Sequence, residues 1–124
     1  MAKRICTVLG VVFLLVGLAG FAMPGALGMH LSPAHNVVHL VSGAIALYLG
    51  LKGTEDAART FCWVFGAVYL LLGVAGFLAG DGPDRMLTIA PGTLEFGTMD
   101  HIVHVILGAL FLVGGFMSRR PALP

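Results

Sequence analysis

The five histidines are the residues of this sequence best suited to chemistry, and four of them form two spaced pairs. His35 and His39 are four residues apart and His101 and His104 are three apart, so each pair lies on one face if its segment is helical. Neutral imidazole is a good ligand for zinc, copper and iron. Two helices that each present a pair would make a four-nitrogen metal site from His35, His39, His101 and His104, with His30 as a spare.

The spacing His39-x-x-x-Gly43 recurs as His104-x-x-x-Gly108. Each glycine lies one helical turn deeper on the face of its histidine, which leaves room for the edge of a porphyrin. Two histidines from separate helices can hold one haem iron from both sides. The cofactor that the pattern allows is therefore a haem b held by His39 and His104, or a transition-metal ion.

Two interpretations without a ligand also fit these residues. Asp100 in a first helical turn would complement the positive end of the helix dipole, and His39 and His104 would bond to loops and seal one end of the bundle. Each lies about three residues inside its predicted segment, roughly 5 Å of rise, a depth typical of an interfacial side chain. Alternatively, the five histidines and their neighbouring carboxylates could sense pH between about 5 and 7.

The composition shows what surrounds these residues. The chain has 124 residues, of which 58% are hydrophobic and 10% charged, against about 45–50% and about 25% in soluble domains. This excludes a soluble globular domain and a disordered chain. A net charge of +1 provides no excess of positive charge that would attract a polyanion, so we expect no nucleic-acid partner.

Four apolar segments are long enough to cross a bilayer as helices, and their central turns carry no charged residue; they run over about 5–22, 36–51, 61–79 and 101–117. The second is expected to start earlier, with Ser32 as its cap and Pro33 at its first position. The glycine-rich runs lack the alternation of barrel strands. The sequence therefore predicts an all-α, integral membrane four-helix bundle in contact with the lipid bilayer.

The basic residues predict the orientation of this bundle. Only Arg85 lies in the connections that carry the histidines, while the other connections and the ends hold six basic residues: Lys3, Arg4, Lys52, Arg59, Arg119 and Arg120. By the positive-inside rule both termini face the cytoplasm, and the histidines face outward. The expected location is a bacterial cytoplasmic membrane, crossed several times.

An internal match divides the chain into two similar halves. The segment 6–21 matches 62–77 at an offset of 56, with Cys6 on Cys62, and the second and fourth segments match at an offset of 65, with His39 on His104. This predicts one domain over 1–124 made of two tandem helical hairpins in the same orientation, about 5–52 and about 60–118. The first segment has the outline of a secretory signal, but its match to an internal helix favours a retained span.

The motifs Asn36-x-x-His39-x-x-x-Gly43 and Asp100-x-x-x-His104-x-x-x-Gly108, together with the glycine pattern of the first segment, resemble an uncharacterised bacterial family of small four-helix integral membrane proteins, catalogued as a domain of unknown function. The resemblance covers nearly the whole chain. It implies a membrane location and a bundle topology and supplies no activity.

No nucleophile motif, phosphate-binding loop or nucleotide fingerprint occurs in the sequence, so we expect a protein that is not an enzyme. The function favoured by the sequence is a helix-packing accessory that associates with other membrane proteins or with itself. The alternative is a histidine-ligated haem or metal-binding protein in electron transfer or metal handling.

Overall fold

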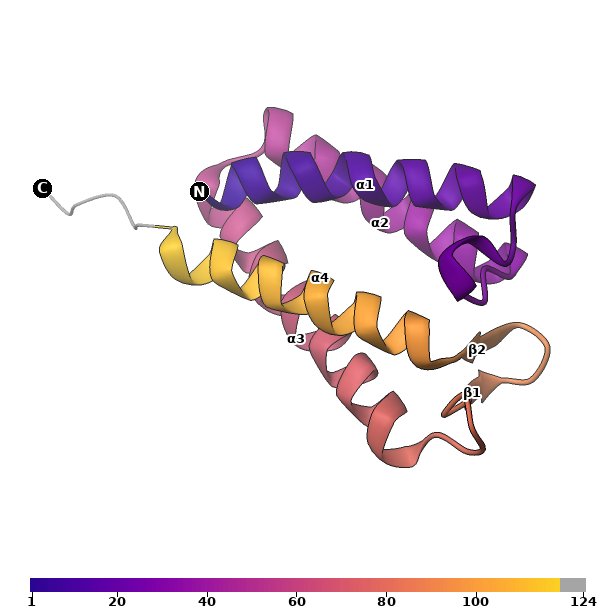
Figure 1. The fold of residues 1–124 in the computed structure, drawn as a ribbon. Helices are drawn as coiled ribbons and strands as arrows, with labels where there is room; N and C mark the ends of the chain where they lie inside the picture. Colours follow the sequence, from indigo (N-terminus) through magenta and orange to yellow (C-terminus); the bar gives the residue numbers. More distant parts are fainter. Residues whose placement is uncertain (119–124) are drawn as a thin grey trace, which may run out of the picture.

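The structure is a computed structural model that describes residues 1–118. It contains four long helices, and each is long and apolar enough to cross a membrane. The elements, shown in Figure 1, are α1 (Ala2–Ala22), the short 3-10 helix η1 (Ala26–Gly28), α2 (Pro33–Lys52), α3 (Glu55–Ala79), β1 (Leu87–Ala90), β2 (Leu94–Phe96) and α4 (Thr98–Met117). The chain is therefore a multi-pass membrane protein. Arg119 and Arg120, which entered the prediction of orientation, lie outside the described residues.

The helices begin earlier than the apolar segments do. Ser32 caps α2 as predicted, because its hydroxyl accepts from the backbone N–H of His35 at 3.2 Å. Asp100 closes the start of α4 by accepting from the N–H of Gly97 at 2.9 Å. His39 and His104 are consequently each the seventh residue of their helix, roughly 9 Å of rise from its start. The expected depth of roughly 5 Å was wrong, because polar capping residues extend each helix beyond its apolar run.

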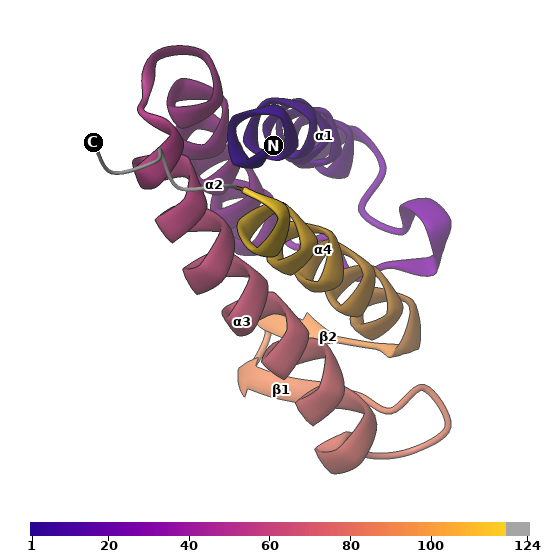
Figure 2. The ribbon, with the colours of Figure 1, turned by 90° about the vertical axis from the view of Figure 1, so that its left-hand side faces the viewer.

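The helices pack as two antiparallel pairs, α1 with α2 and α3 with α4, and the pairs contact each other less extensively. Figure 2 shows both pairs from the end where α1 begins. A Cβ at Gly10 of α1 would lie 2.7 Å from the backbone nitrogen of Leu47, and one at Gly108 of α4 would lie 2.5 Å from that of Leu70. Glycine thus lets the backbones within each pair approach closely, which is a main source of helix association in lipid.

The pairs meet along a buried seam of aromatic and small residues. In its middle, the Phe13 ring lies 5.3 Å from the Tyr69 ring and 6.0 Å from the Phe111 ring, measured between centroids. Where α1 and α3 begin, the sulfur atoms of Cys6 and Cys62 are 3.8 Å apart and fully buried. We call this the cysteine end of the bundle, and the opposite end, where α2 and α4 begin, the histidine end.

The outer faces of the helices are apolar and exposed. Leu15 of α1 and Leu71 of α3 are 62% and 67% exposed, and Phe116 of α4 is 78% exposed. Large apolar side chains in such positions are compatible with lipid and not with water. The bundle therefore presents a lipid-facing surface around a core that contains its polar groups.

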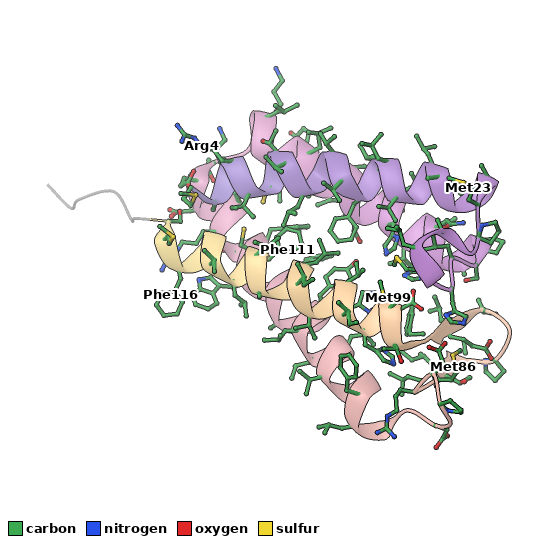
Figure 3. The ribbon with its side chains drawn as sticks, in the orientation of Figure 1. Arg4, Met23, Met86, Met99, Phe111 and Phe116 are labelled. Atoms are coloured by element: carbon green, nitrogen blue, oxygen red, sulfur yellow. The ribbon has the colours of Figure 1, made fainter. Side chains whose placement is uncertain are left out.

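A β-hairpin joins α3 to α4 at the histidine end, an addition to the all-helical architecture (Figure 1). Strands β1 and β2 pair antiparallel, with Leu87 opposite Phe96. The hydroxyl of Ser32 donates to the carbonyl of Thr93, which ties the hairpin to the start of α2. Figure 3 places Met86, in the segment before β1, at the end of the molecule opposite Arg4. The hairpin thus covers the histidine end.

Candidate metal centre

Three histidines converge in the core at the histidine end. His35 and His39 extend from α2 and His104 from α4, and their exposed fractions are 2%, 1% and 1%. One potential ligand atom from each residue lies within 4.8 Å of those of the other two. The helical spacing of four residues brings the two α2 rings together, with their centroids 4.2 Å apart and their planes tilted by 55°. We call His35, His39 and His104 the three-histidine cluster.

Several ring nitrogens of the cluster have no hydrogen-bond partner. His35 Nδ1 lies 2.9 Å from the carbonyl oxygen of His30; a carbonyl only accepts, so Nδ1 carries the proton and Nε2 keeps a lone pair. That Nε2, both ring nitrogens of His39, and Nδ1 of His104 are buried without a partner among residues 1–118. Each such atom costs about 1–3 kcal/mol. Four of them lie together in this cluster, which makes it the candidate site of the bundle.

Aromatic rings enclose the cluster. Phe96 of β2 stands edge-on to His35 and His104, with centroid distances of 4.9 and 5.1 Å, and is itself 4% exposed. On the opposite side, Phe13 lies 5.4 Å from His39 and Tyr69 lies 5.5 Å from His104. The cluster is therefore a nearly dry compartment. In such surroundings an electrostatic interaction is stronger than in water.

The buried carboxylate of Asp100 orients the cluster through His30. Asp100 is fully buried, and it accepts from the backbone N–H of His30 at 3.1 Å and from His30 Nδ1 at 2.9 Å. The same His30 supplies the carbonyl that fixes the ring of His35. Outer partners of this kind set the tautomer and orientation of histidine ligands in metal sites. Asp100 and His30 are therefore positioning residues of the cluster.

His101, the fourth histidine of the predicted site, lies elsewhere. Its Nε2 donates to the carbonyl oxygen of Arg85 at 2.7 Å, and its ring packs against Phe77 at 5.3 Å. A Cβ at Gly76 would lie 2.1 Å from this ring, so His101 fills the space that the glycine leaves on α3. Residues three apart on a helix differ by about 60° in direction. That rotation turns His104 toward α2 and His101 toward α3, so the structure brings together three of the four predicted ligands.

The cluster does not fit a haem between His39 and His104. A porphyrin needs a flat slot between its two axial ligands. His35 occupies this region, since its ring centroid is 4.2 Å from that of His39 and 5.7 Å from that of His104. With His35 this close to both rings, a macrocycle has no flat slot between His39 and His104, whereas a single ion needs none.

Two parts of the site were missed by the sequence analysis. Phe96 belongs to a connection with no clear sequence signal, so its place over the cluster was not predictable. Asp100 was recognised as a partner for a helix dipole, as part of the motif with His104 and as one of the carboxylates near the histidines, but not as the residue that holds His30. Its position just before His101 gave the helix start, but the contact with His30, seventy residues away in the sequence, arises from the tertiary fold.

Comparison with known proteins places the chain in a family. Neither a curated protein nor a solved structure matches the sequence. The chain belongs to the family described as Domain of unknown function (DUF4383), whose family model matches residues 3–117.

Proposed function

We propose that this protein binds one transition-metal ion inside the membrane through His35, His39 and His104. The observation that carries the proposal is the set of four buried nitrogens on the three rings that have no hydrogen-bond partner among residues 1–118. Three imidazoles that converge in a buried compartment suit the holding of an ion. The function is therefore metal handling, and we propose that the protein is not an enzyme.

The geometry needs little adjustment to hold an ion. A metal–nitrogen bond of about 2.0–2.1 Å places nitrogen ligands roughly 3.3–3.6 Å from one another. The cluster atoms lie within 4.8 Å, so each ring has to move by roughly 1 Å or less. His35 keeps its bond to His30 during this change, because the bond uses Nδ1 and the ion would take Nε2.

The charge distribution supports an outward-facing site in a bacterial cytoplasmic membrane. Among the described residues, four basic side chains belong to the cysteine end and its connection: Lys3, Arg4, Lys52 and Arg59. Arg85 is the one basic residue of the described chain at the histidine end. The positive-inside rule then favours a cytoplasmic cysteine end and an ion that arrives from outside.

Metal analysis of the purified protein tests the proposal. After loading in lipid nanodiscs and desalting, the wild-type protein should retain one ion per chain by elemental analysis. His39→Gln and His104→Gln should lower the affinity by about 100-fold or more, because each removes a ligand. His101→Gln is the matched control, since it changes a buried histidine of α4 that lies outside the cluster, and it should bind like the wild type.

Two results of the metal analysis would contradict the proposal. Wild-type protein that retains no ion, or a His101→Gln variant that loses the ion as fully as His104→Gln, would refute the metal site. The function favoured by the sequence, a helix-packing accessory of a membrane complex, would then be the one to pursue by co-purification from native membranes.

The proposed orientation has a separate test. A cysteine introduced at exposed Asp84 should react with a membrane-impermeant maleimide in intact cells, whereas one at Thr54 should react only after the cells are opened. Cys6 and Cys62 are fully buried and give little background. Labelling of the Thr54 position in intact cells would reverse the assigned orientation.

A further inference from the structure

We propose that the three-histidine cluster selects a monovalent soft ion, Cu(I), over divalent ions, with Asp100 as its buried counter-charge. This inference rests on the proposed function, because it names the ion that the metal site takes. It is carried by the charge and number of the buried groups around the cluster.

The first argument is the neutrality of the ligands. The three imidazoles bring no charge, and Phe96, Phe13 and Tyr69 surround them with aromatic rings. The cost of moving an ion from water into such surroundings grows with the square of its charge, so a divalent ion costs about four times as much as a monovalent one of similar size. A site of neutral ligands in a dry compartment therefore binds a monovalent ion more favourably than a divalent ion of similar size.

The second argument is the single buried carboxylate. Asp100 is fully buried at the histidine end, whereas the side chain of Asp84, the next carboxylate along the network, is 52% exposed. Asp100 reaches the cluster through His30, whose carbonyl accepts from His35. One negative charge beside the cluster neutralises one positive charge. A monovalent ion leaves the buried region neutral, and a divalent ion leaves it charged.

The third argument is the number of donors. Within residues 1–118, three side chains make up the cluster, and the rings of Phe96 and Tyr69 pack against it. Zinc held by three protein ligands takes a water molecule as its fourth ligand. Cu(I) has a filled d shell and is stable with three donors, so three imidazoles complete its coordination.

The fourth argument is the presence of soft thioether donors at the histidine end. Four of the six methionines belong to the histidine end of the chain: Met23, Met29, Met86 and Met99. Figure 3 shows Met23, Met86 and Met99 at this end. Met29 lines a cavity of about 550 Å³ together with His30 and Asn36. Thioethers bind Cu(I) in preference to harder divalent ions, so the donors at this end match a soft ion.

Competition titrations of the full-length protein in lipid nanodiscs test the selectivity. Cu(I), kept reduced under anaerobic conditions, is titrated against a chromophoric Cu(I) chelator, and Zn(II) against a zinc indicator. Ag(I) and Cd(II) are added as a matched pair, because both are soft and they differ in charge. We expect Cu(I) and Ag(I) to bind at one per chain, and Zn(II) and Cd(II) to bind at least about 100-fold more weakly.

The counter-charge is tested by Asp100→Asn, which retains an oxygen that accepts from His30. This variant should lose about tenfold in affinity for Cu(I) and Ag(I), while the helical circular dichroism spectrum stays unchanged. His101→Gln, one residue along the helix, should leave the affinity for both ions as in the wild type. Should Asp100→Asn fail to fold, the comparison of Ag(I) with Cd(II) on the wild-type protein tests charge selectivity without it.

The outcomes separate this inference from the proposed function. Cd(II) that binds as tightly as Ag(I), or Zn(II) as tightly as Cu(I), would overturn selection by charge and leave the metal site standing. A folded Asp100→Asn variant with wild-type affinity for Cu(I) would overturn the role of the counter-charge. Failure of all four ions to bind would instead refute the metal site itself.

Discussion

At each end of the bundle, residues that match between the two halves of the sequence approach one another across the core. At the cysteine end, Cys6 and Cys62 lie 3.8 Å apart, and their thiols also contact the carbonyl oxygens of Ala58 and Ala2 at 3.7 and 3.9 Å. At the histidine end, His39 and His104 meet in the same way, but both nitrogens of His39 lack a partner among the described residues.

The difference between the ends lies in a third residue. The cysteines meet among small residues and satisfy one another, so that end is packed and complete. The histidines are joined by His35, whose matching position in the second half is Asp100. The two halves thus contribute a histidine of the cluster at one such position and a carboxylate at the other. The cysteine end is a contact between two equivalent side chains, whereas the candidate site at the histidine end depends on a position at which the two halves differ.

Cys6→Leu should damage the cysteine end and leave the metal site intact. The larger side chain has no room beside Cys62, since both residues are fully buried. We expect a loss of about 1–3 kcal/mol in the free energy of unfolding, measured in detergent, with one ion still bound per chain. Val8→Leu, at a position that is 59% exposed to lipid, is the control and should be close to neutral. Loss of the ion in Cys6→Leu would show that the ends are coupled.

Phe96→Leu should alter metal binding at the histidine end and leave the cysteine end intact. The substitution retains apolar volume and removes the edge-on contacts with His35 and His104. Such aromatic contacts contribute about 0.5–1.5 kcal/mol, so release of the ion should be about 3- to 10-fold faster. Stopped-flow transfer of the ion to a chelator measures the rate, with Phe116→Leu at the cysteine end as control. An unchanged rate would show that β2 does not limit release.

Glu55→Gln should give the smallest effect. The Glu55 carboxylate accepts from the amino terminus at 3.0 Å, from the N–H of Ala2 at 2.8 Å and from the hydroxyl of Ser118 at 2.6 Å. The ion pair is partly exposed, with side-chain exposures of 39% and 32%. Exposed pairs contribute up to about 1 kcal/mol, so thermal unfolding should shift only slightly and metal binding should not change. A loss larger than that of Cys6→Leu would mean that this contact holds the cysteine end together.

Much of the candidate site was readable from residue types at helical spacing. The distance of four residues between His35 and His39 placed both on one face, and the recurrence of His39 as His104 indicated a second helix. The inclusion of His101 rested on the same rule, yet a rotation of about 60° sends it toward α3. Spacing within a helix shows which side chains share a face, but it does not show which neighbour that face meets.

By itself, the sequence determined that this chain forms four apolar helices for a membrane, because composition and segment length decide whether lipid or water is the favourable surrounding. It also determined the Ser32 cap of α2, which depends on contacts within a few residues. The tertiary structure alone decided that Phe96 covers the histidines, that His30 connects Asp100 to His35, and that the haem slot is filled. Those features depend on how the two helix pairs and the hairpin pack, and packing is set by contacts between residues far apart in the chain.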